Sequence, residues 1–370
     1  MKRKISVWLC IIIFVITCVS CGNYEVTEMP MKKEEENIVQ AGKKVGVLMP
    51  TREVERWEDD AENIRKALEI EGYEVIVEFA ENNPYTQITQ MEDMLKKGVE
   101  CMVVVVVDSE IQRETLEKIW KKNIDIIAYD RLIMNTEAVS YYATFDNQSI
   151  GVAMGTYIKE HGKLDEVRMK DEHKTIEFFM GDANDNNAFV IYQGIMEVLG
   201  EYLEDGTLIC KSMETEFADI STRDWSRVFA KKEAARILES YCEDDSLDIA
   251  CCANDTIAYG IIDALNECGY TQENWPLVTG QDAEIEAVKN IINGKQSMTL
   301  YKDTRVLADK CATMVKAVLE GTIPEINNED EYNNGNFKVK SYLCTPIVVD
   351  KDNYREILID SGYYGEEELK

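Results

Sequence analysis

The first residues that could do chemistry are an acid–base pair, Asp130-Arg131, which follows an apolar run that begins at Ile124. The run predicts a buried parallel strand, and the pair stands at its carboxyl end. Open α/β sheets bind ligands just outside the carboxyl ends of their strands. An aspartate offers hydrogen-bond acceptors, and an arginine offers a rigid fork of donors. Together they favour a small polyhydroxylated ligand over an apolar core.

Polar residues recur after other predicted strands. Asn254, Asp282 and Lys302 each follow an apolar run, and Asp185 and Asn187 lie in a loop after another. Taken singly, an aspartate or asparagine in such a place is more often a helix N-cap or a turn residue, and a lysine can be part of a surface ion pair. Their recurrence predicts a cleft between two α/β units whose strand ends face each other.

Two series of alternating strands and helices must position these residues. In the first, apolar runs at 44–49, 101–107 and 124–129 alternate with amphipathic stretches, which predicts a parallel sheet covered by helices. A second α/β unit is expected over roughly 148–300, and a last strand over 343–349. The expected fold class is therefore α/β, with two doubly wound parallel-sheet domains.

The composition excludes several classes of function. The 370 residues carry 70 acidic and 40 basic side chains, a formal net charge of −30, which argues against nucleic acid as a partner because phosphates need basic patches. With only two histidines, histidine-based catalysis and a multi-histidine metal site are not expected. No C-x-x-C spacing occurs among the cysteines after Cys21, so no zinc or redox centre is expected. We expect no cofactor and no metal.

The N-terminal residues predict export and a lipid anchor. Residues 1–21 have a basic start, an apolar stretch and the ending Cys18-Val19-Ser20-Cys21, which resembles the lipobox of bacterial lipoproteins. That resemblance implies lipidation of Cys21 at the outer face of the cell membrane; an uncleaved membrane anchor is the alternative. Residues 22–43 lack apolar periodicity and indicate a flexible tether. An export signal in place of a DNA-binding headpiece excludes a transcriptional regulator.

Several short segments fall in the order and spacing of a known family. They are Glu55-Arg56-Trp57, Ala128-Tyr129-Asp130-Arg131, Phe145-Asp146-Asn147, Asp185-Asn186-Asn187, Ala253-Asn254-Asp255, Gly280-Gln281-Asp282-Ala283 and Met298-Thr299-Leu300-Tyr301-Lys302. As a set, they resemble the bacterial D-xylose-binding proteins, which belong to the type I periplasmic sugar-binding proteins together with the ribose-binding proteins. The resemblance covers the chain from about Lys44 to its end.

The resemblance implies two α/β domains that are joined by three hinge crossings and close over one sugar. It places the first domain at 44–147 plus 303–345. It places the second domain at 148–302 plus 346–370. The ligand would bind in the cleft between them.

The resemblance also implies a set of ligand-binding residues. The sugar hydroxyls would bond to Arg56, Asp130, Arg131, Asp185, Asn187, Asn254, Asp282 and Lys302, and the rings of Trp57 and Trp225 would cover the two faces of the sugar. Sugar hydroxyls both donate and accept, and the C–H faces of a pyranose are apolar, so this mixture of side chains suits the ligand. Ordinary structural roles stay open: Trp57 fits the apolar face of its helix, and Arg56 and Trp225 each fit a helix start at the surface.

The expected function is reversible capture of a monosaccharide, with D-xylose or another pentose as the ligand, for delivery to an ABC transporter permease. Pro50-Thr51 stand where the family pattern tends to be acidic, so the identity of the sugar stays open. In one alternative, a membrane histidine kinase or chemoreceptor binds the sugar-bound form of the protein and so senses the sugar. A remote alternative is an exported glycoside hydrolase that uses Asp130 and Asp282. Neighbouring cations would hold those carboxylates ionised, so we expect no enzyme.

Overall fold

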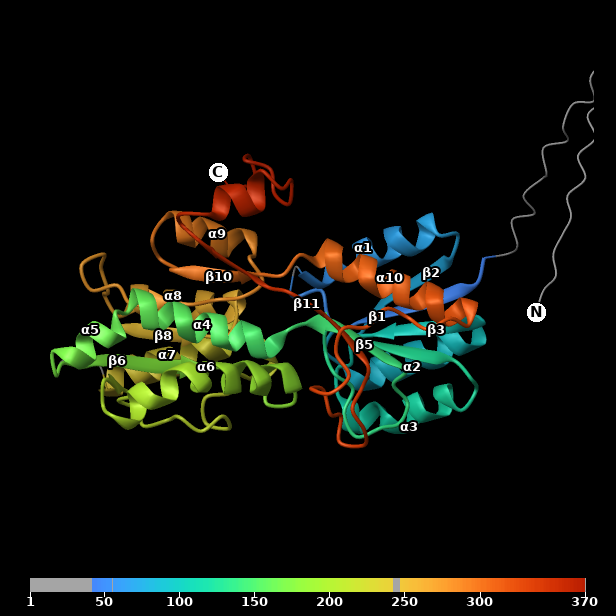
Figure 1. Ribbon diagram of the computed structural model, residues 1–370, viewed down its shortest axis with the longest axis horizontal. Coiled ribbons are helices and arrows are strands. Elements are labelled where there is room, and N and C mark those ends of the chain that lie inside the picture. Colours follow the sequence, from blue (N-terminus) through green and yellow to red (C-terminus); the bar gives the residue numbers. More distant parts are fainter. Residues whose placement is uncertain (1–41, 55, 242–246, 370) are drawn as a thin grey trace, which may run out of the picture. The chain divides into compact units, whose positions relative to one another are not determined.

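The computed structural model describes residues 42–54, 56–241 and 247–369 (Figure 1). The signal peptide predicted at 1–21, the lipidation predicted at Cys21 and the tether up to residue 41 lie outside the described residues. The described residues belong to one compact unit, Gly42–Lys370. Over this part of the chain, no helix is both long and apolar enough to span a bilayer.

Within the described residues, six parallel strands form the first sheet, in the order β11-β5-β4-β3-β1-β2. They are β1 (Lys44–Met49), β2 (Glu74–Phe79), β3 (Val99–Val104), β4 (Asp125–Tyr129), β5 (Tyr141–Phe145) and β11 (Ser341–Cys344). On one face α1 (Arg56–Ile70) packs with α10 (Thr304–Glu320), and on the other α2 (Pro84–Lys96) packs with α3 (Ser109–Trp120) (Figure 1). Val47 joins the cluster under α1, and its neighbour Leu48 joins the cluster under α2 and α3. This strand is buried on both faces, as its continuous apolar run predicted.

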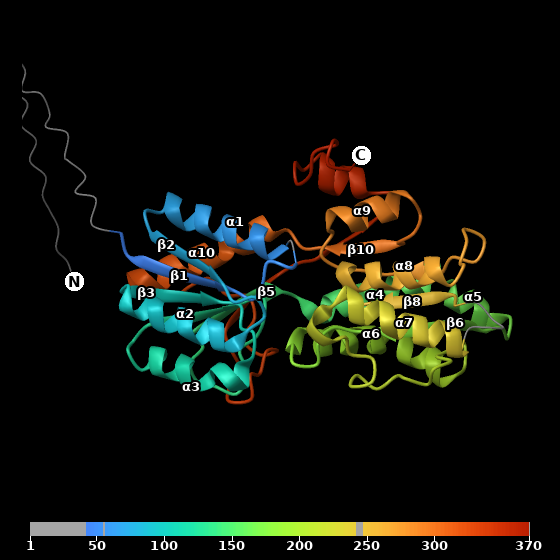
Figure 2. The same cartoon turned by 180° about the vertical axis from the view of Figure 1, so that it is seen from behind.

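In the same part of the chain, four parallel strands form the second sheet, in the order β7-β6-β8-β9. They are β6 (Lys174–Phe179), β7 (Leu208–Ile209), β8 (Ile249–Cys252) and β9 (Leu277–Val278). Helices α4 (Asn147–His161) and α6 (Asn186–Glu204) pack together in front in Figure 1, and α7 (Arg227–Tyr241) and α8 (Asp255–Glu267) pack together in front in Figure 2. The shorter helices α5 (Leu164–Met169) and α9 (Ile285–Ile292) complete the helical layers.

Two glycines let α4 and α6 approach backbone to backbone. A Cβ on Gly151 would lie 2.1 Å from the carbonyl oxygen of Ile191, and one on Gly194 would lie 2.5 Å from that of Gln148. Neither position has room for a side chain. The contact fixes the start of α6, which carries Asn187.

The described chain leaves the first sheet after Phe145, returns to it after Tyr301, and leaves it again after Cys344. The single strand predicted over 343–349 is wrong. It is two strands, β11 and β12 (Ile347–Asp350), because Pro346 lies between them and has no N–H to donate to a ladder. β12 pairs antiparallel with β10 (Met298–Tyr301) beside the parallel sheets.

The segment after β12 packs against β10 and β12. It contains the short π-helix η2 (Arg355–Ile359). The hydroxyl of Tyr364 donates to the carbonyl of Ala283 at 3.0 Å. The last residues therefore support the loop that carries Asp282.

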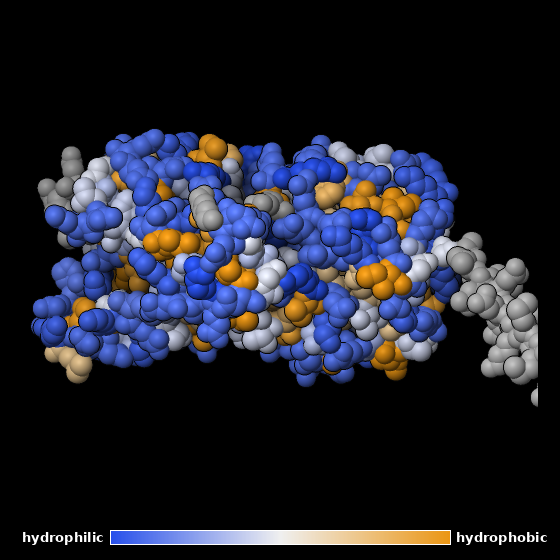
Figure 3. Space-filling model, turned by 90° about the horizontal axis from the view of Figure 1, so that it is seen from above, coloured by the Kyte–Doolittle hydropathy of each residue, from blue (hydrophilic) through white to orange (hydrophobic). Residues whose placement is uncertain are grey.

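The predicted α/β class, with parallel sheets covered by helices, is confirmed. The residue bounds given for the two domains stay a prediction. The face drawn in Figure 3 is mostly hydrophilic, and its apolar residues form small separate groups. That surface agrees with a chain in which 30% of the residues are charged.

Candidate functional site

A cavity of about 50 Å³ gathers the side chains that the sequence predicts to bind the ligand. Its wall contains all ten of them: Arg56, Trp57, Asp130, Arg131, Asp185, Asn187, Trp225, Asn254, Asp282 and Lys302. It also contains seven residues that the prediction missed: Thr51, Val54, Asn82, Asn147, Ile191, Asp224 and Gln281. We call this cavity the inner chamber. It has room for about three to five water molecules. Contact of these residues with a ligand stays a prediction.

The carboxyl ends of strands from both sheets supply most of this wall. Asp130 directly follows β4, and Lys302 directly follows β10. Asp185 accepts a hydrogen bond from the backbone N–H of Asn187 at 3.0 Å, as the cap of α6. Asn254 caps α8 in the same way. Asp185 and Asn254 are therefore helix N-caps, as the sequence analysis allowed, and both also line the chamber.

Several wall residues hold backbone conformations that are uncommon outside glycine. The φ angle is 59° at Asp130, 54° at Trp225 and 101° at Asp282. Each such conformation costs roughly 1–3 kcal/mol, and they concentrate at functional sites. At Asp282 the turn brings two consecutive side chains, Gln281 and Asp282, into the same wall.

Arg56 is the centre of a buried ion-pair network. Its Nε lies 3.0 Å from Oδ2 of Asp60, its Nη1 lies 3.2 Å from Oδ1 of Asp282, and its Nη2 bonds to Asp130. Lys302 Nζ lies 2.7 Å from the same oxygen of Asp282. Burial by itself raises the pKa of Asp130, but Arg56 and Lys302 outweigh it and hold that pKa below its usual range. Arg56 and Lys302 are 7% and 4% exposed, so the surface roles left open for them are wrong.

Asp60 stands behind this network and outside the chamber wall. It is fully buried, and it accepts a hydrogen bond from the hydroxyl of Tyr129 at 2.5 Å. Burial raises the pKa of Asp60 to about 6, although Arg56 and Tyr129 favour its charged form. The sequence prediction missed Asp60, although its place four residues after Arg56 puts both on one face of α1. Asp60 therefore positions the guanidinium that lines the chamber.

Four buried polar atoms of the wall have no hydrogen-bond partner among the described residues. They are Arg131 Nε, Asn147 Nδ2, Trp225 Nε1 and Gln281 Oε1. Arg131 Nε lies 3.0 Å from Oδ2 of Asp185, but without the geometry of a hydrogen bond. A buried polar group without a partner costs free energy. A ligand that both donates and accepts could satisfy all of these atoms.

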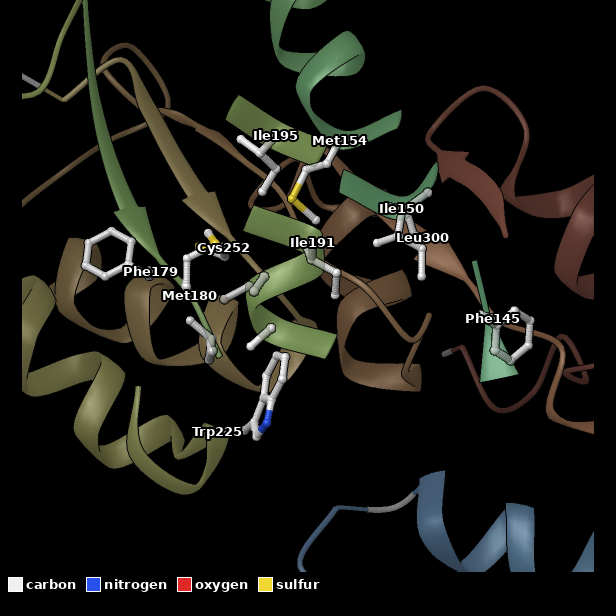
Figure 4. Packing of buried hydrophobic residues seen from close by; sticks show 14 of the residues in the cluster. Phe145, Ile150, Met154, Phe179, Met180, Ile191, Ile195, Trp225, Cys252 and Leu300 are labelled. Atoms are coloured by element: carbon white, nitrogen blue, oxygen red, sulfur yellow. The ribbon is translucent and has the colours of Figure 1, made fainter. Parts of the chain in front are cut away.

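Two indole rings border the chamber. Trp57 packs in the core under α1, as its alternative role predicted, and still reaches the wall. Trp225 ends the short 3-10 helix η1 (Arg223–Trp225) and is 9% exposed, so its surface role is wrong. Figure 4 shows its ring at the edge of the buried cluster, near Met180 and Ile191. A Cβ on Gly181 would lie 2.2 Å from this ring. The position of the Trp225 ring therefore requires glycine at residue 181.

The three cations of the wall pair with its carboxylates. The wall contains Arg56, Arg131 and Lys302 against Asp130, Asp185, Asp224 and Asp282, and each cation lies in an ion pair with one of these aspartates. This pairing favours a neutral ligand, because an added charge would be buried without a partner. No group of three or more His, Cys, Asp or Glu residues in the described part of the chain is placed to hold a metal ion. A carboxyl whose pKa is lowered, as that of Asp130 is, is a poor general acid.

Comparison with known proteins places the chain among binding proteins. Residues 45–323 match the family described as "Periplasmic binding protein domain". The chain is 39% identical over 330 residues to the multiple sugar-binding periplasmic receptor ChvE of Rhizobium radiobacter, a match that covers 88% of this chain and 92% of the relative. It is 31% identical over 329 residues to the D-xylose-binding periplasmic protein of Haemophilus influenzae, with 88% and 92% covered.

Solved structures agree with this match. An ABC transporter solute-binding protein from Clostridium phytofermentans with bound β-D-glucose is 43% identical, has a TM-score of 0.84, and is matched over 89% of this chain and 100% of that chain. The Caulobacter myo-inositol-binding protein is 18% identical, with a TM-score of 0.69 over 85% of this chain and 95% of that chain. That more distant likeness supports the fold alone.

Proposed function

This chain belongs to the periplasmic binding protein family and has its type I fold, and from that premise we propose that it captures one neutral monosaccharide in the inner chamber. The family resemblance carried by the short segments is confirmed. The observation that carries the proposal is a wall whose cations are paired with carboxylates and which also holds unpartnered donors and an unpartnered acceptor.

The chemical groups of a monosaccharide match those of this wall. Its hydroxyls can accept from Arg131, Asn147 and Trp225 and donate to the free oxygen of Gln281. The buried carboxylates and cations offer charge-assisted hydrogen bonds, which are the strong ones. The indole rings can cover the apolar C–H faces of a pyranose. Binding requires no bond to be made or broken, so the proposed activity is capture and release.

The ligand that we propose is an aldopyranose, with D-xylose or another pentose as the sugar expected from the sequence. One relative is named for D-xylose, and a solved relative holds β-D-glucose. These two sugars have the same arrangement of ring hydroxyls and differ by one hydroxymethyl group. A wall that bonds to the ring hydroxyls can therefore accept both.

We propose that the loaded protein delivers its sugar to an ABC transporter permease, at the outer face of the membrane to which Cys21 would anchor it. A solved relative is named as an ABC transporter solute-binding protein. Sensing through a membrane kinase or chemoreceptor is the second candidate, because another relative is named as a receptor. Deletion of the gene separates the two. Transport predicts loss of uptake of the labelled sugar, and sensing predicts loss of the transcriptional or chemotactic response with uptake intact.

The test of sugar capture is a thermal-shift panel on the purified full chain with D-xylose, D-ribose, L-arabinose, D-glucose and D-galactose. A ligand that binds only the folded state raises the melting temperature with the logarithm of its concentration over Kd. We expect a shift with D-xylose or D-glucose. Asp130→Asn should lose the shift, because Asp130 lines the chamber and bonds to Arg56.

The matched control is Asp93→Asn, because the side chain of Asp93 is half-exposed, bonds to Lys96 on the same helix α2, and does not line the chamber. It should keep the full shift. No shift of the wild type with any sugar would overturn the proposal. An equal shift in Asp130→Asn would remove Asp130 from the site.

A further inference from the structure

A second cavity, of about 150 Å³, adjoins the inner chamber, and we call it the outer chamber. The two chambers share five wall residues: Asn82, Arg131, Asp185, Asp224 and Trp225. Beyond them, the outer chamber lies between the loop after β3, with Val106 and Val107, and the loop after β6, with Asp182 and Asn184. The proposed capture of one monosaccharide leaves this cavity without a role.

The shared wall carries donors that have no acceptor. Nε of Arg131 and Nε1 of Trp225 have no hydrogen-bond partner among the described residues, and Trp225 is only 9% exposed. Both residues line both chambers. An acceptor oxygen that sits at the junction of the chambers could satisfy them. A hydroxyl oxygen of the monosaccharide is such an acceptor, and a glycosidic oxygen that links it to a second sugar unit can take the same place.

The size of the outer chamber indicates whether its occupant is a second sugar unit or a smaller substituent of the first. The inner chamber has room for about three to five water molecules, and the outer chamber for about ten to fifteen. A hydroxymethyl group adds only two non-hydrogen atoms to a pentose and would leave most of the outer chamber empty. A second pyranose is of the right order of size.

The chemistry of the outer wall favours a neutral occupant. The loop after β3 contributes Val106 and Val107 together with Asp108 and Ser109, and the loop after β6 presents amides and carboxylates. Negative charge exceeds positive charge in this wall, which disfavours uronic acids and sugar phosphates. The carboxylate of Asp182 already accepts from the backbone N–H groups of Asn184 and Asp224. Within the described residues, no acidic group here is placed to hold a metal.

We propose that the outer chamber is a binding site for a second sugar unit, so that the protein also captures neutral disaccharides with one ring in each chamber. This inference rests on the proposed capture of a monosaccharide in the inner chamber. The unit in the outer chamber has its apolar face on the valine side and its hydroxyls toward the loop after β6. The linking oxygen lies beside Arg131 and Trp225.

The test is isothermal titration of the purified full chain with D-xylose, D-glucose, xylobiose, cellobiose and maltose. We expect a disaccharide of the bound sugar to bind within about tenfold of the monosaccharide. Val107→Trp and Asn184→Trp fill the outer chamber from opposite sides, and neither residue lines the inner chamber. Each should weaken the disaccharide by about tenfold or more and leave the monosaccharide unchanged.

The matched control is Val228→Trp, since Val228 is 75% exposed and lines neither chamber. It should change neither affinity. Binding of the monosaccharide without any disaccharide would overturn the second site and leave the proposed function standing. Disaccharide binding that both filling variants leave unchanged would also overturn it. Absence of all binding would overturn the proposed function and this inference together.

Discussion

Gly181→Ala should weaken sugar binding although Gly181 itself is not in the chamber wall. The new Cβ would lie 2.2 Å from the ring of Trp225. Carbon atoms pack at about 3.5–4.0 Å, so the ring must move by roughly 1.3–1.8 Å. Displacing a large apolar contact by that much should cost about 1–3 kcal/mol of binding, or about five- to 150-fold in Kd.

Isothermal titration with the sugar found in the thermal-shift panel measures this effect. The control is Gly200→Ala on α6, where an added Cβ meets nothing within 4 Å. It should leave Kd unchanged and stabilise the protein by about 0.5–1 kcal/mol, because alanine is the better helix former.

A double-mutant cycle tests the mechanism. If Gly181→Ala acts by displacing the indole, it should add less than about 0.5 kcal/mol of binding loss to a protein that already carries Trp225→Ala. An unchanged Kd in the single variant would refute the reasoning. So would a full additional loss in the Trp225→Ala background, since no ring remains there to be displaced.

Three further predictions concern groups around the chamber. Burial raises the pKa of Asp60 to about 6 in the folded protein, above the value of about 4 for the unfolded chain, so its contribution to stability is complete below pH 4 and is lost as the pH rises through 6. Urea unfolding should therefore show wild type losing about 3 kcal/mol relative to Asp60→Asn between pH 4 and 8, and parallel pH profiles would contradict this. Gln281→Met removes a buried oxygen that lacks a partner, so it should raise the melting temperature of the ligand-free protein and weaken sugar binding by about 0.5–1.5 kcal/mol. A variant in which the melting temperature and the sugar affinity both rise, or both fall, would count against this. Gly151→Ala would place a Cβ 2.1 Å from a backbone oxygen and should destabilise folding by about 1–3 kcal/mol, whereas a melting temperature equal to that of Gly200→Ala would show that α4 and α6 can separate freely.

The sequence could predict the parts of the chamber that follow apolar strands. Asp130, Asn254 and Lys302 each come directly after such a run, and the carboxyl ends of parallel strands meet along one edge. That these three side chains lie near one another was therefore predictable from the sequence. The resemblance to a known family supplied Trp57 and Trp225, neither of which directly follows an apolar strand.

The residues that were missed were not predicted from their place in the chain, although Asn147 and Gln281 lie in the segments that resemble the family. Gln281 precedes Asp282, and in a regular strand adjacent side chains point to opposite faces. The φ of 101° at Asp282 breaks that alternation and puts both in one wall. Asn82 lies in a turn after β2 and Asp224 in a short 3-10 helix, where polar residues are ordinary. Their place in the wall depends on how distant loops meet, which local pattern does not encode.

The strand order of the first sheet affects how the protein folds during and after its synthesis. Its edge strand β11 begins at Ser341, although its partner β5 ends at Phe145. A ribosome therefore releases every strand of the second sheet before it releases the strand that completes the first. Until then β5 presents an unpaired edge, which is a template for aggregation. Such long-range pairing also slows folding. If the chain is exported, as its N-terminal residues predict, it must stay unfolded until it has crossed the membrane, and we expect the late arrival of β11 to delay completion of the first sheet.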